Sequence, residues 1–251
     1  MYSKVCKKCG KAFVSSSRNT RNCEECSKYK PKLYKSKYSC NRFVGDLEGL
    51  SYFIGFVYAD GHVSDVQKRI QFLSSDEQIV RDISKRLGYN RPITVQESKL
   101  GYKTIYSNTL FSDNYRYFKS IGFLANKNEW SLDNLPEVEL YHFLRGLLDG
   151  DGHIATYKGV NGNILLSSIN FLGREKMLLS IQERLGHGSI HNVTKDGRKE
   201  LLYNLQVSGV KAYQLLWNMW NDCTISLERK LKVFEALKDH TFEVISKKRV
   251  L

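Results

Sequence analysis

Two aspartates occur in nearly the same short context at distant positions in the chain. Asp60 lies in ADGH and Asp151 in GDGH, 91 residues later, and each ends a nearly continuous apolar stretch of helical length. A carboxylate at the C-terminal end of a helix opposes the helix dipole, and a second carboxylate beside it adds repulsion. The arrangement favours a divalent cation as the compensating charge. Mg²⁺ prefers oxygen ligands, lowers the pKa of a bound water and stabilises charge on an attacked phosphate, which is the chemistry of phosphodiester hydrolysis.

A glycine lies in the middle of each apolar stretch. Gly55 and Gly146 each cost about 1 kcal/mol relative to alanine inside a helix, so the fold must gain something in return. Close approach of two packed helices through these glycines would supply that gain and would bring Asp60 and Asp151 together. One copy of the motif alone would indicate only a helix C-terminus followed by a turn. Two copies with the same glycine, the same following histidine and the same downstream pattern favour a duplicated functional site.

The elements that position these motifs form two similar halves. KRLG ending at Gly88 recurs as ERLG ending at Gly186, and hydrophobic periodicity predicts the order αββαββα in each half. The composition divides the chain into a cysteine module at 1–27, a basic linker at 28–45, a first half at 46–121, a linker at 122–136 and a second half at 137–251.

The first half is expected to begin with a buried motif helix that has Asp46 as its N-cap. The strands and helices that follow it are predicted at 62–66, 69–74, 77–88, 93–98, 102–110 and 113–121. In the second half, Pro136 suits the first turn of the motif helix, and Glu137 and Glu139 suit its dipole. The later strands and helices are predicted at 153–158, 163–170, 174–186, 189–194, 200–208, 210–222 and 226–239.

In these motifs the chain resembles a known family. FIGFVYADG, from Phe53 to Gly61, and LRGLLDGDG, from Leu144 to Gly152, are similar to the two signature motifs of the single-chain LAGLIDADG homing endonucleases. The likeness covers residues 46 to 240, and the first copy has Tyr58 where an Asp is usual. It implies an α+β fold of two pseudo-symmetric αββαββα halves, whose antiparallel, saddle-shaped sheets straddle DNA.

The same resemblance implies a monomeric, Mg²⁺-dependent endonuclease that makes double-strand breaks at a long DNA site. One motif aspartate would direct cleavage of each strand and leave short 3′ overhangs, with Ala59 and Gly150 joining the aspartates in binding Mg²⁺. Lys127 and Lys230 match by placement the basic residues that the family uses near its metals. Because both halves lie on one chain, the target need not be a palindrome. Two alternatives with the same fold stay open, namely a maturase that assists RNA splicing and a regulator that binds DNA without cutting it.

Polar side chains alternate with apolar ones along the predicted strands. In ELLYNLQVSG the amides fall on one face, and Thr94, Gln96 and Ser98 alternate in the same sense. Amides can pair with adenine edges, and a two-stranded ribbon fits the major groove of B-DNA. Polar strand faces that simply meet water are the alternative, and the family resemblance favours DNA contact. The candidate DNA-contact residues are Gln96, Lys103, Asn163, Asn192, Lys195, Arg198, Asn204 and Gln206, with Lys35 and Lys37 in the basic linker.

The composition limits the class of protein. A formal net charge of +13 and a pI near 9.4 indicate a polyanionic partner, and 41% hydrophobic residues in a chain of 251 are ample for a core. No apolar run approaches the ~20 residues of a membrane-spanning helix, and the start lacks the apolar core of a signal peptide. We therefore expect a soluble, intracellular protein, cytoplasmic or organellar, with no membrane partner.

Four cysteines near the N-terminus have the spacing of a metal site. Cys6, Cys9, Cys23 and Cys26 follow C-x₂-C-x₁₃-C-x₂-C, which predicts a four-thiolate Zn²⁺ site that folds only with its metal. Two disulfides are the alternative, and they suit an intracellular protein less well. Residues 1–45 hold twelve Lys or Arg against two Glu, a net charge of +10. The module and its linker are therefore expected to extend the footprint on DNA, mainly through phosphates.

Overall fold

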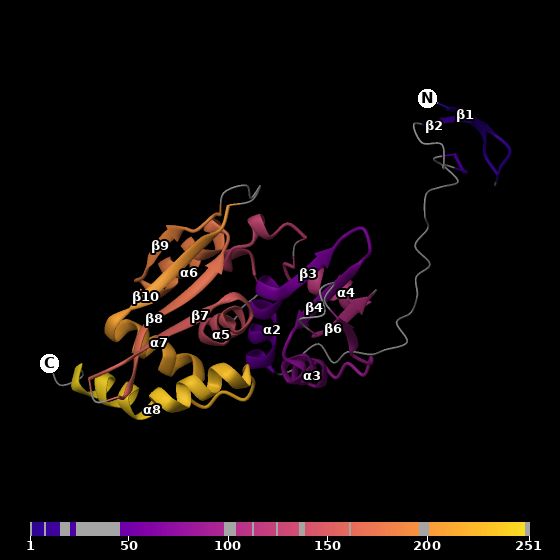
Figure 1. Cartoon of the computed structure of the whole chain (residues 1–251). Helices are drawn as coiled ribbons and strands as arrows, with labels where there is room; N and C mark the ends of the chain where they lie inside the picture. The colour runs from indigo at the N-terminus through magenta and orange to yellow at the C-terminus, as the bar shows by residue number, and fades with distance from the viewer. Residues whose placement is uncertain are drawn as a thin grey trace. The chain divides into compact units, whose positions relative to one another are not determined.

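The computed structural model describes residues 2–7, 9–15, 21–23, 46–97, 104–111, 113–123, 125–135, 139–160, 162–195 and 201–248. The chain divides into two compact units, Met1–Lys35 and Ser36–Leu251, and Figure 1 labels the elements of both. Within the described ranges, no helix is both long enough and apolar enough to cross a bilayer.

The smaller unit contains a two-stranded antiparallel hairpin, which the cysteine spacing does not predict. Strand β1 (Tyr2–Val5) pairs with β2 (Ala12–Ser15). In the connection between them, the backbone N–H of Cys6 donates to the carbonyl of Lys11 at 2.8 Å, and that of Gly10 donates to the carbonyl of Cys6 at 2.9 Å. Gly10 has a positive φ of 71°, a conformation that glycine adopts at no steric cost. The hairpin thus folds the first cysteine pair into a tight turn.

The larger unit contains, among its described residues, two sheets of four antiparallel strands. The first half consists of α2 (Leu47–Asp60), β3 (Gly61–Ser64), β4 (Arg69–Ser74), α3 (Glu77–Arg86), β5 (Thr94–Glu97), β6 (Thr104–Phe111) and α4 (Asp113–Ser120). Two short 3₁₀ turns follow, η1 (Lys127–Glu129) and η2 (Leu132–Asn134). The second half consists of α5 (Leu140–Asp151), β7 (His153–Lys158), β8 (Ile164–Gly173), α6 (Glu175–Leu185), β9 (Ser189–Asn192), β10 (Tyr203–Ser208), α7 (Gly209–Trp220) and α8 (Glu228–Lys248).

The two sheets have equivalent strand orders, β3-β4-β6-β5 and β7-β8-β10-β9. One face of each sheet packs on the core: in β4, Ile70 and Phe72 are fully buried, and in β10, Leu205 and Val207 are. The residues between them point to the opposite face, because side chains alternate along a strand. These findings confirm the predicted α+β class and the αββαββα order of each half.

The motif helices α2 and α5 lie side by side, with the first sheet next to α2 and the second next to α5 (Figure 1). The Asp46 side chain accepts a hydrogen bond from the Gly49 N–H at 2.8 Å, which confirms the predicted N-cap. From Ser51 to Ala59 every residue of α2 is buried. A helix that is apolar all round is stable in water only when neighbours cover each side, and α5 and the first sheet do so here.

Two helix boundaries differ from the sequence prediction. Helix α5 begins at Leu140 rather than at Pro136; its N-cap Glu139 is extended, and the Glu139 N–H donates to the Ser51 hydroxyl at 3.0 Å. Helix α8 continues to Lys248, past the expected end at residue 239. Thr241 is fully buried there, so packing against the core prolongs the helix beyond its sequence periodicity.

Two connecting or edge segments have features that the sequence did not predict. Among the described residues strand β5 pairs with β6 alone, and all four of its residues are exposed, so neither face of this edge strand is covered. The predicted linker at 122–136 is partly a core element, because Trp130 and Leu132 are 1% and 2% exposed. The side chain of Tyr58 in α2 packs on Trp130, with ring centroids 5.5 Å apart.

Candidate active site

The two mid-helix glycines lie where the motif helices approach each other most closely. A Cβ atom on Gly55 would lie 2.1 Å from the carbonyl oxygen of Phe143, and one on Gly146 would lie 2.0 Å from that of Tyr52. Both distances are far below van der Waals contact, so any larger residue would force the backbones apart. A Cβ on Gly150 would lie 2.3 Å from the Ala59 Cβ, which shows that the C-terminal ends of the helices also lie close together.

Asp60 and Asp151 are the last residues of these helices. Asp60 is partly buried and Asp151 is exposed. Burial, followed by the negative charge of Asp151, raises the pKa of Asp60 to about 6, although Lys127 and Lys230 act in the opposite direction. The two carboxylates are therefore close enough to repel each other at neutral pH. A hard divalent cation fits this donor set, because it would relieve the repulsion that otherwise favours a proton.

A lysine ammonium group donates hydrogen bonds to backbone carbonyls at the C-terminal end of each motif helix. The Lys127 ammonium, from η1, donates to the Ala59 carbonyl at 2.7 Å. The Lys230 ammonium, from α8, donates to the carbonyls of Leu148 and Gly152, the latter at 3.0 Å. Burial lowers the pKa of both lysines, that of Lys230 to about 8. Positive charge at these carbonyls complements the helix dipoles and lies beside the two aspartates.

An open pocket of about 270 Å³ adjoins the end of α2. Its lining is polar and cationic and consists of Gly61, His62, Val63, Ala125, Asn126, Lys127, Asn128 and Arg174. Arg174 was not predicted from the sequence. It precedes α6 in the second half, and its backbone N–H donates to the Tyr58 hydroxyl at 2.9 Å. Only the tertiary fold brings it to the first half, so no local sequence signal could have found it.

The predicted contact residues on strands and loops divide into three groups. Asn204 and Gln206 lie half-buried on the face of β10 that is opposite to the core. Gln96, Asn163, Asn192 and Lys195 are exposed, the first on the edge strand β5 and the others at strand ends and loops. Lys35, Lys37, Lys103 and Arg198 lie outside the described residues.

A hydrogen-bonded amide row, absent from the prediction, crosses the second sheet. The Asn204 amide donates to Asn170 Oδ1 at 3.1 Å, and the Asn170 amide donates to the Ser168 hydroxyl at 3.0 Å. Asn204 Oδ1 is buried and has no hydrogen-bond partner in the described part of the chain. Alternation along β8, where Ile169 and Phe171 are buried, would have placed Asn170 and Ser168 on this face.

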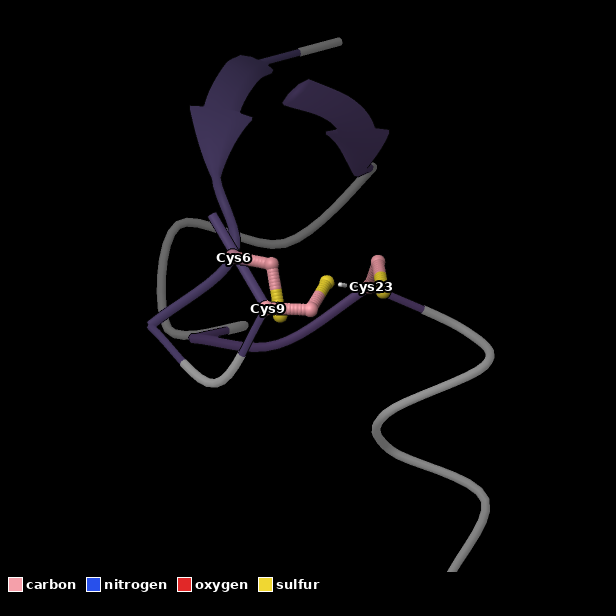
Figure 2. A group of neighbouring side chains, drawn as sticks. All are labelled: Cys6, Cys9 and Cys23. Carbon is pink, nitrogen blue, oxygen red and sulfur yellow. Dashed lines mark hydrogen bonds between the residues drawn. The ribbon is translucent and has the colours of Figure 1, made fainter. Parts of the chain in front are cut away.

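In the smaller unit three cysteines converge. The sulfur atoms of Cys6, Cys9 and Cys23 all lie within 4.8 Å of one another, and those of Cys9 and Cys23 are 3.6 Å apart (Figure 2). This separation exceeds an S–S bond of roughly 2.05 Å. It is close to the roughly 3.8 Å between two sulfurs of a tetrahedral zinc site with ~2.3 Å bonds. The three thiols can therefore hold one metal ion, and Cys26 lies outside the described residues.

The comparisons with known proteins are structural only. No protein-family model matches the sequence, and no curated protein matches it either. The homing endonuclease I-WcaI bound to its DNA recognition sequence has a TM-score of 0.50 at 13% identity, covering 74% of this chain and 86% of that one. This chain has the fold of that structure.

Two other solved structures have a TM-score of 0.47. The I-LtrWI LAGLIDADG homing endonuclease bound to target DNA is 15% identical, and the match covers 82% of this chain and 93% of that chain. Full-length DUF199/WhiA from Thermatoga maritima is 14% identical and covers 82% of this chain, which in turn spans only 62% of that protein.

Proposed function

We propose that this chain is a LAGLIDADG-type homing endonuclease that cuts double-stranded DNA at a long site by Mg²⁺-dependent phosphodiester hydrolysis. The observation that carries the proposal is the contact of two glycine-bearing helices that end in repelling carboxylates, Asp60 and Asp151. The fold shared with I-WcaI, which is described as bound to its DNA recognition sequence, supports the same reading.

In this proposal Asp60 and Asp151 hold the metal, with the carbonyls of Ala59 and Gly150 as further oxygen donors. When bound, Mg²⁺ would supply an activated water and charge stabilisation at the phosphate. Lys127 and Lys230 are candidates for contacting the DNA phosphate, because their ammonium groups lie at the helix ends, where this negatively charged group would approach. Each lysine serves one half, which suits a reaction that must be carried out once on each strand.

The polar faces of the two sheets are the proposed DNA-contact surface. In the second sheet the Ser168–Asn170–Asn204 row presents amides that are already oriented by mutual hydrogen bonds. An amide can pair with two atoms of an adenine edge in the major groove. Since the two faces carry different residues, the proposed target is asymmetric and one chain suffices as a monomer.

We further propose that the smaller unit binds Zn²⁺ through Cys6, Cys9, Cys23 and Cys26. The sulfur separations among the first three support a tetrahedral thiolate site. The net charge of +10 over residues 1–45 supports a role in holding DNA phosphates outside the two halves at 46–121 and 137–251.

Cleavage of a randomised duplex library in Mg²⁺ tests the proposal. The wild-type chain is expected to give double-strand breaks at one sequence, and chelation of Mg²⁺ should abolish them. Asp60→Asn and Asp151→Asn should lose cleavage or leave nicks, because each removes a carboxylate from the metal site. Binding without any cleavage would favour a DNA-binding regulator, and binding to structured RNA alone would favour a maturase.

A further inference from the structure

Asp149 is a buried carboxylate for which the proposed chemistry has no use. It lies in α5, two residues before Asp151, and is 2% exposed. Its Oδ2 accepts hydrogen bonds from the Tyr52 hydroxyl of α2 at 2.8 Å and from the Leu227 N–H at 2.7 Å. Its Oδ1 is buried without a hydrogen-bond partner in the described residues. Removing a carboxylate from water is costly, so this group is expected to organise what surrounds it.

The hydrogen bonds of Asp149 lead directly to Lys230. Leu227 immediately precedes α8, and the Lys230 N–H donates to the Leu227 carbonyl at 2.9 Å. The Lys230 side chain, 5% exposed, then reaches back to the carbonyls of Leu148 and Gly152 at the end of α5. Asp149 therefore fixes the start of the helix that carries the lysine.

The first half positions its lysine without a buried carboxylate. The residue two positions before Asp60 is Tyr58, and its ring lies 5.9 Å below the Lys127 ammonium. The Tyr58 hydroxyl accepts a hydrogen bond from the Arg174 N–H. Lys127 is therefore aligned by a ring and by its own carbonyl contact, with no buried carboxylate at the equivalent position.

We propose that Asp149 is a positioning residue that holds Lys230 over the end of α5, so that the two halves support their lysines by different means. One consequence of this proposal rests on the proposed endonuclease function: loss of Asp149 should slow cleavage of one DNA strand. The affected strand is the one that a Lys230 variant also slows.

A labelling experiment tests the positioning step without DNA. Acetylation rates of individual lysines are measured by mass spectrometry on the full chain for wild type, Asp149→Ala and Asp149→Asn. Lys232, on the same helix and 68% exposed, is the internal control. Loss of the bond in Asp149→Ala should raise Lys230 labelling about 10-fold with Lys232 unchanged, and Asp149→Asn, which keeps an acceptor oxygen, should lie between. Unchanged Lys230 labelling in Asp149→Ala would overturn the inference, whether or not the chain cuts DNA.

Strand-resolved cleavage tests the consequence. With each strand of the cleaved site labelled separately, Asp149→Ala and Lys230→Gln should slow the same strand, and Lys127→Gln should slow the other. If Asp149→Ala does not fold, Tyr52→Phe, which leaves Asp149 one of its two bonds, should give a smaller effect on the same strand. Equal slowing of both strands by the Asp149 variants would refute the strand-specific role. A wild-type chain that cuts no DNA, with Lys230 labelling as expected, would reject the endonuclease proposal and retain the positioning role.

Discussion

The contact between the motif helices can be tested with one methyl group. In Gly146→Ala the new Cβ would lie 2.0 Å from the Tyr52 carbonyl oxygen and 2.9 Å from the Phe56 nitrogen, both of which are backbone atoms of α2. Favourable non-bonded contacts lie near ~3.5 Å, so α2 and α5 must move apart by about 1 Å or more. A backbone cannot rotate away as a side chain can, and the strain therefore spreads along both helices.

The expected loss of unfolding free energy follows from two opposing terms. Overpacking costs about 1–3 kcal/mol, and alanine recovers about 1 kcal/mol of helix propensity relative to glycine. Because the clash is between backbones, we take the upper end of the first term and expect a net loss of about 2 kcal/mol. Gly55→Ala should behave alike, since its Cβ would lie 2.1 Å from the Phe143 oxygen.

Urea denaturation of the metal-free protein measures this loss. Gly159→Ala is the matched control, because its Cβ would lie 2.9 Å from the flexible end of the Leu165 side chain. The control should stay within about 0.5 kcal/mol of wild type, as typical surface substitutions do. A Gly146→Ala protein that is also unchanged, with no loss of cleavage, would refute the close packing of the two helices.

Three further predictions concern charge and metal. Because the pKa of Asp60 is raised from 3.8 to about 6, the folded chain holds a proton that the unfolded chain releases. The free energy of unfolding of the metal-free protein, relative to Asp60→Asn, should therefore fall by about 2 kcal/mol as pH rises from 4 to 6. Urea titrations across that range check this, and a difference that is independent of pH contradicts it. Elemental analysis should find about one Zn²⁺ per chain in wild type and in Cys223→Ser, and none in Cys9→Ser; retention by Cys9→Ser would exclude the thiolate site. Removing residues 1–45 should weaken DNA binding and flatten its dependence on salt concentration while bound DNA is still cut, and an unchanged salt slope would exclude a phosphate-binding role for this segment.

Much of the fold was predictable because its periodicity is local. Strand β4 and the starts of α3 and β7 lie where the periodicity of apolar residues predicted them. Asp46 caps α2, as its position before an apolar run predicts. The misjudged boundaries depend on distant contacts. The Ser51 hydroxyl of the other half accepts from the Glu139 N–H just before α5, and burial of Thr241 carries α8 onward.

The candidate site was only partly predictable. The aspartates and glycines could be found because the motif is duplicated, and duplication is visible in the sequence itself. Arg174 reaches the first half only through tertiary packing, so its neighbours in sequence give no indication of it. Asp149 did leave a signal, since it is a charged residue inside a largely apolar helical stretch that also contains Arg145, but its partners Tyr52 and Leu227 are distant in sequence.

The most direct test of the paired carboxylates is divalent-cation binding itself. Mn²⁺ binding to the full chain on its DNA target can be followed by electron paramagnetic resonance for wild type and for the double variant Asp60→Asn/Asp151→Asn. Asp222→Asn, at an exposed aspartate between α7 and α8, is the control. Loss of two oxygen ligands should weaken binding at least about 10-fold in the double variant and leave the control unchanged. Equal Mn²⁺ affinity in all three proteins would show that the ends of the motif helices do not hold the metal.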